Sequence, residues 1–227
     1  MVTQGATILD IGGESTRPGS QPVSTDEELK RVIPAIERLA GELPVPVSID
    51  TYKAAVARGA LAAGAAMIND VRGLKQDPRL AGVAAEAGVP LILASNQRDE
   101  PCPDDIMAEI ILSLKKSIGL ARAAGVAGQD IIIDPGIGFG KTLAQNLEII
   151  RRLAELKSLG KPILLGTSRK SVIGLVLDLP PSKRLEGTAA TVAIGIANGA
   201  DIIRVHDVKQ MVRVCRMSDA IVRGGVK

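Results

Sequence analysis

The sequence predicts a parallel α/β fold, and three observations favour a closed barrel over an open sheet. Short apolar runs alternate with helical stretches along the chain. The runs are continuous in Val, Ile and Leu, which is typical of strands buried on both faces of a parallel sheet. Every run ends in polar residues. All strand ends of a barrel converge on one mouth, whereas an open sheet binds ligands at a switch point, so the last observation favours the barrel.

Seven strand-helix units can be counted in the 227 residues. The expected strands lie in ATILDIGGE, VPVSIDT, AAMINDV, VPLILASNQ, DIIIDPGIGFGK, KPILLGTSRK and DIIRVHD. Helices are expected near residues 26–42, 52–63, 77–87, 103–124, 143–158, 183–198 and 207–222, and Thr51 is placed to cap the second. Glycines in QGAT, AGAA and NGAD suit the turn from a helix into the next strand. No linker divides the chain, so we expect one domain over residues 1–227, a TIM-type (β/α)8 barrel lacking one recognisable unit.

Composition excludes several classes of protein. The net charge is only +3, and Tyr52 and Phe139 are the only aromatic residues, which argues against nucleic-acid binding and against a base-stacking surface. No apolar run is long enough to span a membrane, and no signal peptide opens the chain. His206 is the only histidine, and Cys102 and Cys215 lack metal-ligand spacing, so we expect free thiols and a cytoplasmic location.

Three strands end in side chains that can form hydrogen bonds with a flat heterocycle. Asp50, Asn69 and Asp134 occupy these positions. A carboxylate accepts two N–H groups of an aminopyrimidine ring, and an Asn amide both donates and accepts. Leaving such groups buried without partners would cost about 1–3 kcal/mol each. The alternative is that they cap helices or tie loops, which suits one such residue better than all three.

Cationic side chains follow other strands and predict a phosphate-binding region. Arg17, Lys170, Arg204 and His206 form this set, because Arg and Lys are the usual clamps for phosphate groups. Pyrophosphate is the ligand that we expect, as part of a substrate and as a leaving group. The alternative is a set of solvated surface charges, which fits Arg204 least because it follows an apolar run.

The segment DPGIGFGK contains three glycines that allow the backbone to approach a ligand closely. Its spacing differs from that of a Walker loop and from that of a dinucleotide fingerprint. Phe139 either packs on a ligand ring or fills the mouth of the barrel.

With these residues in view, the chain resembles the dihydropteroate synthase family. The matching stretches are DIGGESTRPG, SIDTYKAAVA, INDV, DPGIGFGKT, GTSRKS, RLEGT and RVHDV, in the order of the family and over nearly the whole chain. The resemblance implies a (β/α)8 barrel that condenses a dihydropterin pyrophosphate with para-aminobenzoate in folate biosynthesis and is a target of sulfonamides. Mg²⁺ is the implied cofactor, and a homodimer is the implied assembly.

The resemblance also implies roles for individual residues. Asp50, Asn69, Asp134 and Lys170 would hold the pterin beside Phe139. Arg204 and His206 would hold the pyrophosphate together with Thr16 and Arg17, which lie on a loop over the site. Ser171 and Arg17 would face the aminobenzoate. Asp134, Lys170 and Arg204 would carry the catalysis.

Two departures from the family pattern lead to further expectations. The family begins with a strand that carries N-x-T-P-D-S-F, and this chain lacks it, so no metal ligand is assigned. Ala94 and Ser95 stand where the family has Met-His, which alters one wall of the pterin pocket. We expect unpaired edges at TILDIG and DIIRVH, weak catalysis and retained pterin binding. The alternatives are a non-catalytic pterin-binding barrel and a corrinoid-linked methyltetrahydrofolate methyltransferase, and STRPG and SRKS speak against the latter.

Overall fold

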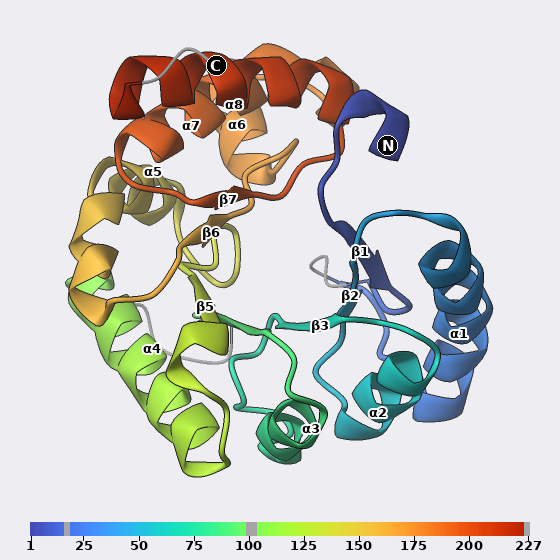
Figure 1. Cartoon of the computed structure of the whole chain (residues 1–227). Helices are drawn as coiled ribbons and strands as arrows, with labels where there is room; N and C mark the ends of the chain where they lie inside the picture. Colours follow the sequence, from blue (N-terminus) through green and yellow to red (C-terminus); the bar gives the residue numbers. More distant parts are fainter. Residues whose placement is uncertain (16–18, 99–103, 225–227) are drawn as a thin grey trace.

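Parallel strands form the inner layer of the molecule, and helices surround them (Figure 1). The computed structural model describes residues 1–15, 19–98 and 104–224. Its strands are β1 (Leu9–Gly12), β2 (Val47–Asp50), β3 (Met67–Asp70), β4 (Leu91–Ala94), β5 (Ile131–Asp134), β6 (Leu164–Leu165) and β7 (Ile202–Ile203). Its α-helices are α1 (Thr25–Glu42), α2 (Ala54–Ala62), α3 (Arg79–Ala87), α4 (Ile106–Ala123), α5 (Leu143–Arg151), α6 (Ser171–Leu177), α7 (Leu185–Ala197) and α8 (Val208–Arg223). Short 3-10 helices are η1 (Val2–Gln4), η2 (Gly128–Asp130), η3 (Leu153–Leu159) and η4 (Pro181–Lys183).

The strands follow one another around the inner layer in chain order. β1 to β5 form one parallel sheet, and β6 pairs with β7. A bridge between Ile133 and Ile163, together with the hydrogen bond from the Ile133 N–H to the Pro162 carbonyl (2.9 Å), joins the two groups. Within the described residues, β1 pairs only with β2 and β7 only with β6. The two expected unpaired edges are therefore confirmed, and the strands between them follow the order of the predicted barrel.

An apolar layer fills the inside of the strands, as expected for a barrel of this type. The buried residues of this layer are Met67, Ile92, Ile132 and Leu164, with Ile8 and Ile202 packed against them. Two larger clusters lie between the strands and the outer helices, one centred on Ile49 and Leu80 and the other on Ile110 and Ile149. The polar strand ends therefore lie above a buried apolar layer.

Local sequence explains where several strands begin. Gly5, Gly64 and Gly199 adopt φ values of 102°, 105° and 102°, in the left-handed region that favours glycine. Each precedes a strand, as the small residue-Gly-Ala pattern predicts. At the N-terminal end of the chain, η1 packs against the C-terminal helix α8, beside the edge of β1 (Figure 1).

Two details differ from the sequence prediction. Helix α2 begins at Ala54, and Thr51 does not cap it; the Asp77 carboxylate accepts the Ala54 N–H instead (3.1 Å). Helix α6 was not predicted, because its seven residues are too few to display a helical repeat. Asp178 ends this helix with a left-handed φ of 53°. Across the described residues, no helix combines the length and apolar content needed to cross a membrane.

Candidate active site

A polar level lies above the apolar layer, at the carboxyl ends of the strands. Residues two apart in a strand point to the same face, so each residue of the polar level lies one step above a residue of the inner layer. The pairs are Ile8 and Asp10, Met67 and Asn69, Ile132 and Asp134, and Ile202 and Arg204, whereas the polar Ser48 lies two residues before Asp50. On β4 and β6 the same level holds the small residues Ala94 and Gly166. Strands β4 and β6 flank β5, so the two small residues leave space on both sides of Asp134.

Asp10 links the predicted pterin residues to the predicted phosphate residue. Its Oδ2 accepts hydrogen bonds from Asn69 Nδ2 (3.0 Å) and from Arg204 Nε (2.6 Å). Arg204 Nη2 also donates to Asp50 Oδ2 (3.1 Å). Arg204 thus spans the side between β7 and β1 that lacks strand pairing. Sequence reasoning missed Asp10, although TILDIG has the same pattern of an apolar run ending in a carboxylate as SID and IID.

Asp134 and Lys170 form a second group, beside the glycine-rich loop. Asp134 Oδ1 accepts the Gly136 N–H (2.7 Å), and the residue is buried. Lys170 Nζ donates to the Ile137 carbonyl (2.5 Å) and lies 4.8 Å from the centre of the Phe139 ring. The Arg98 guanidinium lies 4.9 Å from the same ring. Phe139 is buried beneath these two cations, and its packing on a ligand ring stays a prediction.

The glycine-rich loop can approach the loop after β4 closely only because Gly136 and Gly140 have no side chains. Gly136 has a φ of 72°, and a Cβ atom there would lie 1.9 Å from the Ser95 carbonyl oxygen. At Gly140, with a φ of 74°, a Cβ atom would lie 2.4 Å from the Arg98 backbone nitrogen. Lys141 Nζ donates to the Ser95 carbonyl (2.8 Å) and to the Gly136 carbonyl (2.9 Å). The loops after β4 and β5 are therefore tied together.

Burial and neighbouring charges shift the protonation of these groups. Burial, together with the nearby Asp10 carboxylate, raises the pKa of Asp50 to about 7, and Arg204 opposes this shift. Burial also raises the pKa of Asp134, against the opposing effect of Lys170. The pKa of Lys170 falls to about 8 because of burial, while Asp134 acts in the other direction. Groups that change charge near neutral pH are typical of functional sites.

The remaining predicted residues lie further out. His206 is exposed, and its Nδ1 lies 2.9 Å from Ser168 Oγ. Ser171 is exposed at the start of α6, directly after Lys170. Thr16 and Arg17 lie outside the described residues, so their roles stay predictions. The structure brings Asp50, Asn69 and Arg204 together through Asp10, and it leaves His206 and Ser171 at the rim.

A cavity of about 530 Å³ extends from the polar level to the side between β7 and β1. Asp10, Asn69 and Arg204 line its polar part, and Ile8 and Ile202 line its apolar part. Within the described residues, no group of three or more His, Cys, Asp or Glu side chains could hold a metal ion alone. Asp10 Oδ1 is buried there without a hydrogen-bond partner. One carboxylate combined with substrate phosphates fits the way that proteins bind Mg²⁺.

Comparison with known proteins gives a consistent result. Residues 1–206 match the family described as pterin binding enzyme. The chain is 54% identical to the dihydropteroate synthase of Bacillus subtilis (strain 168) over 227 residues, which is 100% of this chain and 79% of that protein. It is 44% identical to the dihydropteroate synthase of Escherichia coli (strain K12), over 97% of this chain and 80% of that protein.

Solved structures agree with the sequence comparison. A dihydropteroate synthase from Clostridium difficile, determined in the presence of pteroic acid, superposes with a TM-score of 0.95 at 54% identity, over 98% of this chain and 84% of that one. The Xanthomonas albilineans enzyme with 4-aminobenzoic acid gives a TM-score of 0.93 at 43% identity, over 97% and 81% of the two chains. The chain therefore belongs to the pterin-binding enzyme family and, within it, to the dihydropteroate synthases, which are transferases of folate biosynthesis.

Proposed function

We propose that this chain joins 6-hydroxymethyl-7,8-dihydropterin pyrophosphate to para-aminobenzoate and releases pyrophosphate. The observation that carries the proposal is the polar level above the apolar layer, where acceptors and cations from five strands meet around a space left by Ala94 and Gly166. The relatives named above support the substrates, since one structure was determined in the presence of pteroic acid and another with 4-aminobenzoic acid.

The acidic side of this level is suited to the pterin ring. Asp134 is buried and retains acceptor capacity beyond its bond to Gly136, so it can accept N–H groups of the ring. The Asn69 amide can offer its carbonyl oxygen to the ring while its Nδ2 remains bonded to Asp10. Lys170 and Phe139 close the pocket on the side of the glycine loop. Asp50 can bind the ring once it has lost its proton.

The cationic side is suited to the leaving group. In the reaction, the bond between the pterin methylene carbon and the pyrophosphate oxygen breaks, and its electron pair leaves with the oxygen. The amine nitrogen of aminobenzoate supplies the pair for the new C–N bond and then loses a proton to solvent. Lys170 and Arg204 stabilise the negative charge that develops on the pyrophosphate, and Asp134 stabilises the positive charge on the pterin. His206, Thr16 and Arg17 are the further residues proposed for the pyrophosphate, and Ser171 for the aminobenzoate.

Mg²⁺ is the proposed cofactor. Asp10 would hold it through the buried Oδ1 that lacks a partner, together with oxygen atoms of the substrate pyrophosphate. When bound, it supplies further positive charge for the leaving group.

A coupled pair of measurements tests the proposal. The purified chain is mixed with both substrates and Mg²⁺, dihydropteroate is detected by mass spectrometry, and pterin binding is measured by calorimetry. We expect product formation and saturable pterin binding. In Asp134→Asn, product formation should be lost and pterin binding should be much weaker. Pterin binding that is the same in Asp134→Asn and in the wild type would show that the pocket lies elsewhere.

A homodimer and a cytoplasmic location are also proposed. Large apolar side chains are exposed on neighbouring helices, including Leu175 on α6, Ile194 on α7 and Met217 and Ile221 on α8 (Figure 1). Such a surface is typical of an interface between subunits. Light scattering on wild type and Ile221→Glu tests this, because the substitution should produce monomers. Cys215 is a free thiol, in keeping with a reducing compartment, whereas Cys102 lies outside the described residues.

A further inference from the structure

The turn that leads into Lys170 has an unusual backbone conformation. The Lys170 N–H donates to the Thr167 carbonyl (3.1 Å), which closes a turn between β6 and α6. Arg169, the third residue of this turn, has a left-handed φ of 57° although it carries a side chain. A residue other than glycine keeps such a conformation only where its surroundings fix it. The contacts around Arg169 therefore decide the direction in which Lys170 leaves the turn.

The start of helix α7 supplies these contacts. Thr188 Oγ1, which is fully buried, accepts the Arg169 N–H (3.1 Å). Arg184, which immediately precedes α7, donates from Nη1 to the Arg169 carbonyl (2.9 Å) and to the Lys170 carbonyl (3.3 Å). Arg184 and Thr188 are the first and last residues of RLEGT, a stretch to which the proposed function gives no role.

The Arg184 guanidinium is itself held against α6. Its Nε donates to the carbonyl of Leu179, just beyond the C-terminal end of α6 (2.8 Å). It also lies against Gly174 in the middle of α6, where an added Cβ atom would lie 2.0 Å from Arg184 Nη2. The rigid fork of a guanidinium can donate in two directions at once, so Arg184 fixes the turn before α6 to the segment after it.

The Lys170 side chain extends from this turn to the loop after β5. Its Nζ donates to the Ile137 carbonyl (2.5 Å) and lies 4.8 Å from the centre of the Phe139 ring. Within the described residues, the Arg184 guanidinium donates only to the backbone carbonyls of Arg169, Lys170 and Leu179. Any effect of Arg184 on a bound ligand must therefore pass through the turn and Lys170.

We propose that Arg184 is a positioning residue, which acts through the Arg169 and Lys170 carbonyls to aim the Lys170 ammonium group at the site. The inference rests on the proposed function, which assigns Lys170 to the pterin pyrophosphate. Loss of the guanidinium allows Arg169 to leave its left-handed conformation, and the Lys170 ammonium group is then no longer held where the ligand binds.

The test is a double-mutant cycle, measured as calorimetric affinity for the pterin pyrophosphate. Arg184→Met keeps an apolar chain and removes the donors. We expect it to bind the ligand about fivefold more weakly than the wild type does, within the range found for residues that share a network. In the Lys170→Ala background, the same substitution should cause no further loss. A role confined to stability would instead give losses that multiply, because independent sites are additive in free energy.

Gly174→Ala provides a second variant, because it displaces the guanidinium while leaving every donor and every charge in place. Alanine is the better helix former, so a loss of helix stability cannot account for weaker binding. We expect a smaller loss in the same direction, which Lys170→Ala should again abolish.

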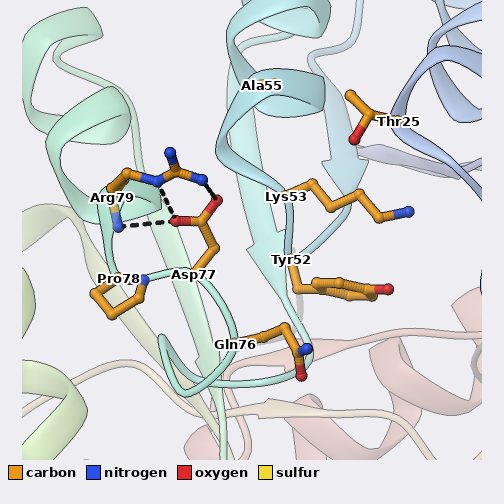
Figure 2. A pocket seen from close by; sticks show the side chains of 8 residues that line it. All are labelled: Thr25, Tyr52, Lys53, Ala55, Gln76, Asp77, Pro78 and Arg79. Carbon is orange, nitrogen blue, oxygen red and sulfur yellow. Dashed lines mark hydrogen bonds and ion pairs between the residues drawn. The ribbon is translucent and has the colours of Figure 1, made fainter.

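Arg79 offers a matched control, because it also lies at the start of a helix, as the first residue of α3. Figure 2 shows it beside a surface cavity of about 580 Å³, where it donates to Asp77 Oδ1 (2.8 Å) and Oδ2 (3.0 Å). Neither of these bonds involves the turn before α6. Arg79→Met should therefore match the wild type in every measurement.

Losses that multiply in the double variant, or wild-type affinity in both Arg184→Met and Gly174→Ala, would overturn the inference. Unchanged affinity in Lys170→Ala would overturn it too, because the contact on which it rests would be absent. Asp134→Asn is measured in parallel: unchanged pterin affinity in that variant contradicts the proposed function. If Asp134→Asn and Lys170→Ala lose affinity while Arg184→Met and Gly174→Ala do not, only the positioning role fails.

Discussion

The β1–β5 sheet and the β6–β7 pair hold their functional groups in different ways. Strands β2 to β5 have four residues each and are almost entirely buried, and Asp134 at their end is bonded to the backbone of its own loop. The β6–β7 pair has two residues in each strand. The Arg204 side chain that follows it is exposed and donates hydrogen bonds to the carboxylates of Asp10 and Asp50. Under the proposed function, the first region would bind the ring with little rearrangement, and Arg204 in the second would exchange its carboxylate partners for a phosphate.

The sharpest test of this comparison removes one charge from the buried region. Asp134→Asn keeps the shape of the side chain but loses an acceptor, and it removes the negative charge that stabilises the pterin cation. We expect pterin affinity to fall by about a hundredfold, at the upper end for a charged hydrogen-bonding group, and activity to be lost. Calorimetry and product detection measure both.

Asp130 offers the control for that substitution, because it lies just before β5, at the opposite end of the same strand. Asp130→Asn should leave pterin affinity and activity unchanged. Equal effects of the two substitutions would mean that the carboxyl end of β5 has no special role.

The rigidity of the buried region depends on Gly136. An alanine there would have an unfavourable φ and a Cβ atom 1.9 Å from the Ser95 carbonyl oxygen, so the loops after β4 and β5 would have to separate. We expect Gly136→Ala to lower the free energy of unfolding by about 2–4 kcal/mol, the sum of backbone strain and overpacking. Urea unfolding measures this loss.

Gly119→Ala in α4 serves as the counterpart, because nothing lies within 4 Å of its added Cβ. It should stabilise the protein by about 0.5–1 kcal/mol, since alanine is the better helix former. If Gly136→Ala is as stable as this variant, the close approach of the two loops does not contribute to stability.

The region that follows β6 and β7 should discriminate between ligands more than it contributes to stability. We expect Lys170→Ala and Arg204→Ala each to weaken binding of the pterin pyrophosphate about tenfold more than binding of the unphosphorylated pterin, as lost contacts to a charged group imply. Arg58→Ala, which breaks an exposed ion pair with Glu86, should alter neither affinity. Equal losses for both ligands would remove the pyrophosphate assignment.

A dependence of stability on pH tests the buried carboxylate of Asp50. The pKa of Asp50 is raised from 3.8 to about 7, so between these values the folded chain binds a proton that the unfolded chain has released. The free energy of unfolding therefore falls as pH rises through this range, and Asp50→Asn should lack this part of the dependence. Urea titrations at pH 5 and pH 7 on both proteins measure the difference. Parallel curves for the two proteins would contradict the shift.

Ligand affinity should depend on the protonation of Asp50 and of Lys170. Binding of the unphosphorylated pterin should strengthen as pH rises through about 7, where Asp50 loses its proton. Binding of the pyrophosphate ligand should weaken again above about 8, where Lys170 loses its charge. Calorimetry across this range gives both profiles, and a pyrophosphate profile without the second change would exclude Lys170 as its cation.

The sequence by itself determined the order of strands and helices, and it pointed to most of the residues of the candidate site. Each strand carries its polar end residue in a short local pattern, such as SID, IND or IID. Asp50, Asn69 and Asp134 could therefore be found without knowing which strands are neighbours. The same pattern in TILDIG could have identified Asp10.

Only the tertiary structure decided which of these groups meet. Asp10 and Arg204 are 194 residues apart and bond because β1 and β7 face each other across the polar level. Lys53 donates hydrogen bonds to Glu14, Val23 and Glu28, which belong to a different strand-helix unit. Periodicity specifies the face on which a side chain lies, but the partner of that side chain depends on register and on the closing of the strands around the core, which no local pattern encodes.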